Sequence, residues 1–138
     1  MPRKSITVTI DGSDPFMARD AGKVFRITEL PATQAERWAL RAFMAMAKAG
    51  VDIPENISSA GLAGLMSIGL GALSKIEFHD ALALMDEMWT CVQIQPDPNE
   101  SRTVRGLIES DVEEVPTRLF LRRQTLGLHV NFSIPADG

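Results

Sequence analysis

The side chains best suited to catalysis or metal binding in this 138-residue sequence are two histidines and one cysteine. His79 and His129 lie far apart in the chain. Neither has a second histidine one helical turn away, as a helical zinc site would require. Cys91 is the only cysteine, which excludes an intramolecular disulfide and a cysteine cluster for zinc. A Cys91–histidine pair for nucleophilic catalysis needs only proximity in space, which the sequence leaves open. We expect surface or internally hydrogen-bonded histidines and a small buried cysteine.

Three other patterns are similar to ligand sites but lack essential residues. The glycines of residues 61–71 lack the Gly-Lys-Ser/Thr ending of a phosphate loop, which favours close helix packing instead. Residues 97–100 lack the glycine and the terminal glutamate of a calcium loop. The carboxylates of residues 109–114 could in principle supply a general acid, but a solvated helix start explains them more simply. We therefore expect a protein that is not an enzyme and that has no metal or cofactor.

Composition and charge indicate one globular domain over residues 1–138. Hydrophobic residues make up 45% of the chain and charged residues 23%, which argues against global disorder. The net charge of −4 disfavours a general nucleic-acid binder, because phosphate contacts need surplus lysine and arginine. Residues 56–74 are uncharged, but glycines and serines dilute them. Neither tryptophan or tyrosine nor a cluster of lysine and arginine flanks them, so we expect no membrane span. No signal-peptide pattern opens the sequence, so we expect a cytoplasmic location.

Alternation and turn residues predict two β-hairpins. Residues 5–10 alternate apolar and polar side chains, and a second extended run follows the loop after them, so we expect an N-terminal hairpin over about residues 5–30. Residues 91–95 and 103–108 flank a proline-rich turn. They predict a second hairpin over about residues 91–108.

A helical core is expected between these hairpins, over about residues 33–90. Its first helix begins with a capping box from Thr33 to Glu36 and ends at Gly50, with Trp38 on its apolar side. An uncharged helix over residues 60–73 should follow. A third helix over residues 77–90 is expected to bury Phe78, Leu82, Met85, Met88 and Trp89.

A last helix is expected over about residues 111–131. A second capping box, from Ser110 to Glu113, would start it. Pro116 then lies beyond the first turn, so the helix either kinks there or truly begins near it. The predicted fold is therefore α+β and helix-dominated, with about four helices and two short β-hairpins.

Several runs of the sequence resemble a known family. They are RDAGKVFRITELPA at residues 19–32, AERWA at 35–39, GVDIP at 50–54, CVQI at 91–94, and EEV with RL within 113–119. These runs are similar to the phage and prophage tail assembly chaperones, and the likeness covers most of residues 19–133. The resemblance implies a non-enzymatic protein that keeps the tape-measure protein soluble during tail assembly in the host cytoplasm. It carries over packing and capping residues and no catalytic residue.

A methionine-bearing helical domain could bind an amphipathic helix of such a partner, because thioethers adapt to irregular surfaces. The expected surface joins Met44 of the first helix to Gly64 and Met66 of the uncharged helix. The arginines of the last helix could pair with acidic residues of the partner: Arg118, Arg122 and Arg123. A homo-oligomer is also compatible with the sequence.

Three alternatives to the chaperone stay open at this point. One is a structural tail component, such as a tube or tail-completion protein, which would need more β-structure and stable ring assembly. Another is a small cytoplasmic protein-interaction module unrelated to phage. The third is an enzyme or regulator whose site the sequence does not reveal.

Overall fold

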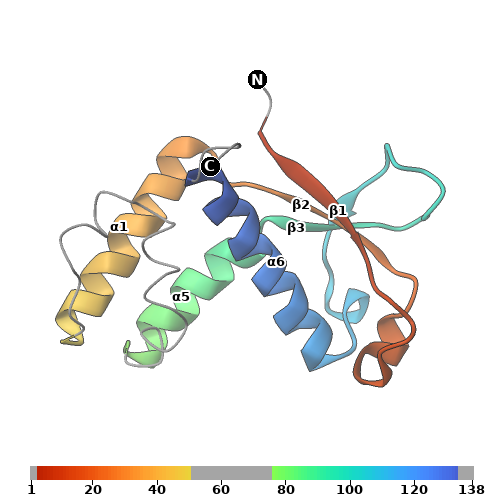
Figure 1. The fold of residues 1–138 in the computed structure, drawn as a ribbon, viewed down its shortest axis with the longest axis horizontal. Coiled ribbons are helices and arrows are strands. Elements are labelled where there is room, and N and C mark those ends of the chain that lie inside the picture. Colours follow the sequence, from red (N-terminus) through yellow and green to blue (C-terminus); the bar gives the residue numbers. More distant parts are fainter. Residues whose placement is uncertain (1–2, 51–75, 134–138) are drawn as a thin grey trace. The chain divides into compact units, whose positions relative to one another are not determined.

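The computed structural model describes residues 3–50 and 76–133 (Figure 1). The chain divides into two compact units. The first unit combines residues 1–29 with 88–128, and the second combines residues 30–87 with 129–138. Helices α5 and α6 each begin in one unit and end in the other. That residues 1–138 form one domain stays a prediction.

One antiparallel sheet organises the first unit. Its strands are β1 (Ser5–Thr9), β2 (Val24–Thr28), β3 (Val92–Gln95) and β4 (Arg105–Gly106), in the order β1-β2-β3-β4. Both predicted pairings are therefore present, although the two hairpins are joined into a single four-stranded sheet through β2 and β3. The α+β prediction is confirmed.

The middle of this sheet supplies most of its buried apolar side chains. Phe25 and Ile27 of β2 are fully buried, and Val92 and Ile94 of β3 are buried opposite them. Strand β1 alternates exposed and half-buried side chains, as expected of an edge strand with one face toward a core. The period-two pattern in the sequence therefore reports burial on one face of the sheet.

A short 3₁₀ helix, η1 (Pro15–Asp20), stands between β1 and β2, where the sequence predicts only a loop. The Asp14 side chain accepts a hydrogen bond from the Phe16 N–H and caps this helix. Proline at the first helical position fits because its missing N–H would have no helical partner there. The signal was present in the Asp-Pro pair.

Helix α1 (Ala32–Lys48) starts earlier than the predicted capping box. Pro31 is the N-cap residue, no side chain caps the helix, and Thr33 already lies in the first turn. The capping-box prediction is wrong because the chain before the helix is fixed from outside it: the Leu30 N–H donates to His129 Nε2. Gly50 follows the last turn with φ of +83°, which confirms the predicted stop.

Helices α1 and α5 (Phe78–Trp89) lie side by side in the second unit (Figure 1). Trp38, Ala42 and Met46 of α1 are buried at a spacing of four residues. The indole Nε1 of Trp38 donates to the Leu84 carbonyl oxygen at 2.8 Å. This contact satisfies the polar end of the indole, so Trp38 is the core anchor that the sequence predicts.

Helix α5 turns a different side to the core from the one predicted. Its buried residues are Leu84 and Met88, whereas Phe78, Leu82 and Met85 are exposed. Met88 is therefore placed correctly, and the burial predicted for the other three is wrong. The reason is tertiary, because the docking of Trp38 on Leu84 sets the rotation of the helix. Trp89 is half-buried, so the full burial predicted for it is also wrong.

The C-terminal region starts with a 3₁₀ helix, η2 (Glu109–Asp111), followed by helix α6 (Val115–Ser133). The capping box predicted over residues 110–113 is wrong, because these residues precede α6. Pro116 is the second residue of α6, where proline removes no helical hydrogen bond. The helix therefore begins beside Pro116 and is not kinked by it. No helix in the described ranges is long and apolar enough to cross a membrane.

The two tryptophans make a matched pair for testing this packing. We expect Trp38→Ala to lower the free energy of unfolding by roughly 3–5 kcal/mol, because it empties a buried site. Trp89→Ala should cost no more than about 2 kcal/mol, because the indole is partly exposed. Urea unfolding followed by far-UV circular dichroism measures both losses, and equal losses would contradict the assignment of Trp38 as the anchor.

Candidate functional site

Three large apolar side chains on one side of α5 are exposed. Phe78 is 69% exposed, Leu82 38% and Met85 42%. Their spacing of four and three residues places them in one row along the helix. With about 100° of rotation per residue, this row lies about a third of a turn from the buried Leu84. We call Phe78, Leu82 and Met85 the α5 stripe.

The neighbouring helix α1 also exposes apolar side chains. Leu40 and Met44, one helical turn apart, are both more than half exposed. They lie on the side of α1 away from its buried residues.

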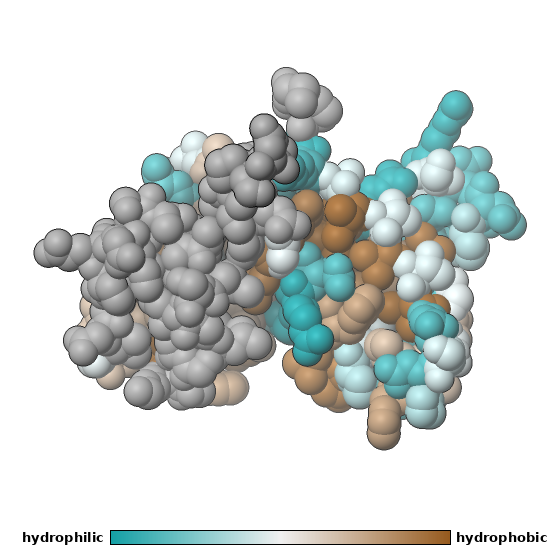
Figure 2. Space-filling view, in the orientation of Figure 1, coloured by the Kyte–Doolittle hydropathy of each residue, from teal (hydrophilic) through white to brown (hydrophobic). Residues whose placement is uncertain are grey.

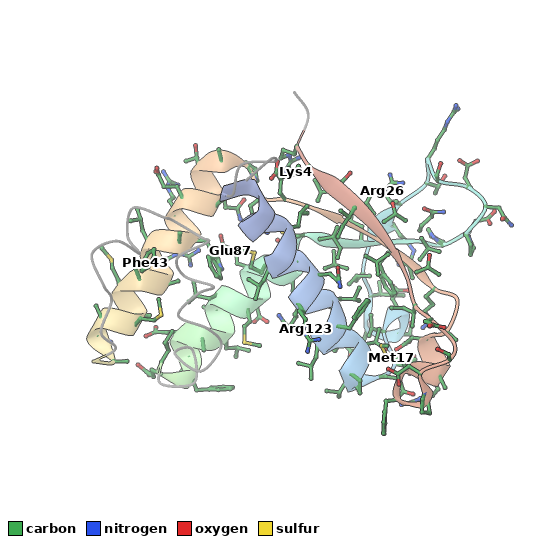
Figure 3. The ribbon with its side chains drawn as sticks, in the orientation of Figure 1. Lys4, Met17, Arg26, Phe43, Glu87 and Arg123 are labelled. Atoms are coloured by element: carbon green, nitrogen blue, oxygen red, sulfur yellow. The ribbon has the colours of Figure 1, made fainter. Side chains whose placement is uncertain are left out.

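A polar link joins α1 to α5. Gln34 and Arg41 of α1 both donate to the Glu87 carboxylate of α5 (Glu87 is labelled in Figure 3). Burial raises the pKa of Glu87, but the Arg41 and Gln34 hydrogen bonds lower it overall, which keeps this link charged.

In the first unit, two arginines of α6 lie over the ring of Trp89. The guanidinium carbon of Arg118 is 4.2 Å from the ring centroid and that of Arg122 is 5.0 Å from it. Both distances are within the range of a cation–π interaction. The sequence shows that the two arginines share one face of a helix, but it gives no sign that they share a tryptophan.

The N-terminus of α6, which positions these arginines, is held by the carboxylate of Asp20. Asp20 Oδ1 accepts the Glu113 N–H at 2.8 Å, and Oδ2 accepts the Glu114 N–H at 2.9 Å. The Glu114 carbonyl oxygen accepts the Arg118 N–H, so Asp20 binds the backbone at the first turn. A carboxylate at this position also interacts favourably with the helix dipole. Sequence reasoning missed this residue.

Lysine supplies the countercharge that a buried carboxylate needs. The Asp20 side chain is fully buried, and Lys23 Nζ donates to its Oδ1 at 2.9 Å and to the Asp111 carbonyl oxygen at 2.9 Å. Burial would raise the pKa of Asp20, but the donors around it lower the pKa to about 2. The Thr117 hydroxyl contributes to this lowering, although no partner in the described ranges meets full hydrogen-bond geometry with it.

Two ion pairs surround this centre. Arg105 binds Asp111 through two contacts of 2.7 and 2.9 Å, and the same carboxylate accepts the Ile108 N–H. The pKa of Asp111 is lowered chiefly by the Arg105 hydrogen bond. Arg19 Nη2 lies 2.8 Å from Glu114 Oε1, and this hydrogen bond lowers the pKa of Glu114. The solvated helix start predicted for residues 109–114 is therefore wrong at Asp111, which is buried and paired.

The two histidines and the cysteine, the side chains best suited to catalysis or metal binding, differ in their surroundings. His129 is buried and its Nε2 accepts the Leu30 N–H at 3.0 Å, as expected of an internally hydrogen-bonded histidine. The His79 ring meets the Phe78 ring edge-on at 5.8 Å between centroids. Cys91 is buried, as predicted. Across residues 3–50 and 76–133, no group of three histidine, cysteine or acidic residues could hold a metal ion.

The six predicted partner-binding residues belong to different parts of the chain, and their joint surface stays a prediction. Gly64 and Met66 lie outside the described residues. Met44 is exposed on α1 in the second unit, whereas the three predicted arginines lie on α6 in the first. Arg123 is exposed and is labelled on α6 in Figure 3. The other two arginines cover the indole of Trp89.

The first unit carries an apolar surface of its own at the N-terminal end of α6 (Figure 2). Val115 and Leu119, one helical turn apart, are both more than half exposed there. Ile108, in the segment before the helix, is also exposed.

Comparisons with models of protein families, with curated proteins and with solved structures found no match to the chain.

The buried carboxylate makes stability depend on pH. Because the pKa of Asp20 falls from 3.8 to about 2 on folding, its charged form stabilises the folded state above pH 3.8. That contribution, about 2 kcal/mol by linkage, should be lost as the pH falls from about 4 to 2. Asp20→Asn should lower the free energy of unfolding at pH 7 by about 3 kcal/mol and flatten this acid limb.

Urea unfolding at several pH values between 2 and 7 measures both effects. The control is Asp97→Asn, which removes an exposed carboxylate in the same unit. It should leave the stability at pH 7 within about 0.5 kcal/mol of the unmodified protein. An Asp20→Asn protein as stable as this control would show that the cap is dispensable.

Proposed function

We propose that this chain is a non-enzymatic phage tail assembly chaperone that binds an amphipathic helix of the tape-measure protein and keeps it soluble. The observation that carries this proposal is the α5 stripe, whose three large apolar side chains are exposed in a row. The resemblance of residues 19–133 to the chaperone family supports the identity of the partner. The protein would act in the cytoplasm of the host cell.

The α5 stripe has the chemistry of a helix-docking surface. Phenylalanine, leucine and methionine at positions i, i+4 and i+7 match the spacing of apolar anchors on a partner helix. Methionine adapts to irregular partners, which suits a surface that must accept several segments of one long protein. A tape-measure helix with one apolar row would otherwise expose it to water and aggregate.

The basic face of α6 supports a second contact with the partner, in the other unit. Arg118 and Arg122 lie over Trp89, and Arg123 is exposed beside them in sequence. An indole with two guanidinium groups offers apolar area and positive charge together, a combination common at protein interfaces. Acidic residues on the partner helix would be attracted to this face.

The rival interpretations have less support. A tube protein would need extensive β-structure, whereas the described sheet has four short strands, one of which spans two residues. An interaction module unrelated to phage would use the same exposed stripe, so only the identity of the partner separates it from the chaperone. An enzyme would need a reactive group in an accessible pocket, whereas His129 and Cys91 are buried.

Co-expression with the tape-measure protein of the same phage tests the proposal. The unmodified chain should raise the soluble yield of that protein and co-elute with it in size-exclusion chromatography. Met85→Glu should reduce the soluble yield at least fivefold, because it replaces one of the three apolar side chains of the α5 stripe by a charge.

The matched control is Ala83→Glu, an exposed position on the opposite side of the same helix. It adds the same charge and should leave the yield unchanged. Since both positions are exposed, both variants should remain folded by circular dichroism. Equal yields with the two variants would remove the α5 stripe from the mechanism, and failure of the unmodified chain to form a complex would exclude the chaperone.

A further inference from the structure

Strand β1 forms one edge of the sheet, and its hydrogen-bonding groups divide into two sets. The Glu29 N–H donates to the Lys4 carbonyl oxygen, and the Ile10 N–H donates to the Lys23 carbonyl oxygen. In an antiparallel ladder this assigns the even-numbered residues of β1 to β2. The N–H and C=O groups of the odd-numbered residues, Ser5, Thr7 and Thr9, therefore point away from the sheet.

Within residues 5–9, this edge lacks several of the features that usually prevent strands from pairing there. Proteins commonly protect an edge with proline, a bulge or inward-pointing charges. Strand β1 reads Ser-Ile-Thr-Val-Thr, contains neither proline nor charge, and pairs with β2 in regular register over its whole length. The side chains of Ser5, Thr7 and Thr9 are exposed. Among the described residues no other strand pairs with its outer side.

We propose that this edge binds the same edge of a second copy of the chain, with the two β1 strands antiparallel about a twofold axis at Thr7. In this register Thr7 faces Thr7 of the second copy, and Ser5 faces Thr9. Every outward N–H and C=O group of the three residues then gains a partner. The two four-stranded sheets become one continuous sheet of eight strands.

The side chains are complementary in the same register. Ile6 faces Val8 of the second copy, so the two half-buried apolar residues of each strand cover one another. The threonine pairs lie on the opposite face, where such pairs are favourable. Two residues beyond each end of the strand, Arg3 faces Asp11 of the second copy, and this pair occurs at both ends of the interface. Both side chains are exposed, so opposite charges meet twice.

A second copy fits this edge better than another occupant because the strand is complementary to itself in hydrogen bonding, apolar contacts and charge at one register. The opposite edge of the sheet does not compete. Strand β4 has only two residues, and the Arg105 side chain is held by Asp111. An interface of one strand pair buries little surface compared with most stable protein–protein interfaces. We therefore expect a dimer that dissociates on dilution.

Sedimentation velocity over about 1–200 µM protein should show an association from 15.1 kDa to twice that mass. Thr7→Pro removes the outward N–H at the twofold axis and keeps the ladder with β2, because proline is tolerated where the N–H faces outward. It should weaken the dimer at least tenfold. Thr7→Val keeps the N–H and the branched side chain, and should leave the dissociation constant within about twofold.

A charge exchange tests the register without relying on proline. Arg3→Glu and Asp11→Lys should each weaken the dimer at least threefold, because each places like charges opposite one another. The double variant, with both changes, should restore it. A chain that stays monomeric at 200 µM, a folded Thr7→Pro protein that still dimerises, or a double variant weaker than both single ones would overturn the proposal. None of these outcomes bears on the α5 stripe, so the chaperone function is tested separately.

Discussion

The first unit depends on one fully buried carboxylate. Asp20 lies at the end of η1, yet it binds the backbone just before α6 and pairs with Lys23. A buried charge is costly unless its oxygens are satisfied, and here each oxygen has a donor. Removing any single donor would leave part of that cost uncompensated. The start of α6, and with it the position of Arg118 over Trp89, is therefore fixed by a residue of another element.

In the second unit, one hydrogen bond has the corresponding role. Trp38 reaches the Leu84 carbonyl oxygen, and this contact sets the rotation of α5 on α1. The same rotation that buries Leu84 leaves Phe78 and Met85 exposed. Exposure of these residues is thus a consequence of how the helix docks, and it costs hydrophobic stabilisation that a bound helix would recover. Packing and the proposed binding surface are two sides of one helix.

The sequence predicted the features that depend on neighbouring residues alone, such as a strand and the end of a helix. Alternation located β1, and Gly50 marked the end of α1 because only glycine adopts its positive φ without strain. What the sequence could not predict depends on distant partners. The apolar side chains of α5 itself point to several sides of the helix, so periodicity alone does not predict which side is buried. Asp20 reads as an ordinary loop acid, and nothing near it in sequence indicates that its partners lie 93 and 94 residues away.

The order of the strands along the chain has a consequence for folding during synthesis. Strands β2 and β3 are adjacent in the sheet, but residues 29–91 lie between them, and the second unit is built mainly from that segment. As the chain leaves the ribosome, β1 and β2 can pair early, whereas β2 must wait for β3 with an open edge. Contacts of such high sequence separation form slowly because of the entropy of loop closure. Strand β2 is therefore the segment most prone to aggregation before the chain is complete.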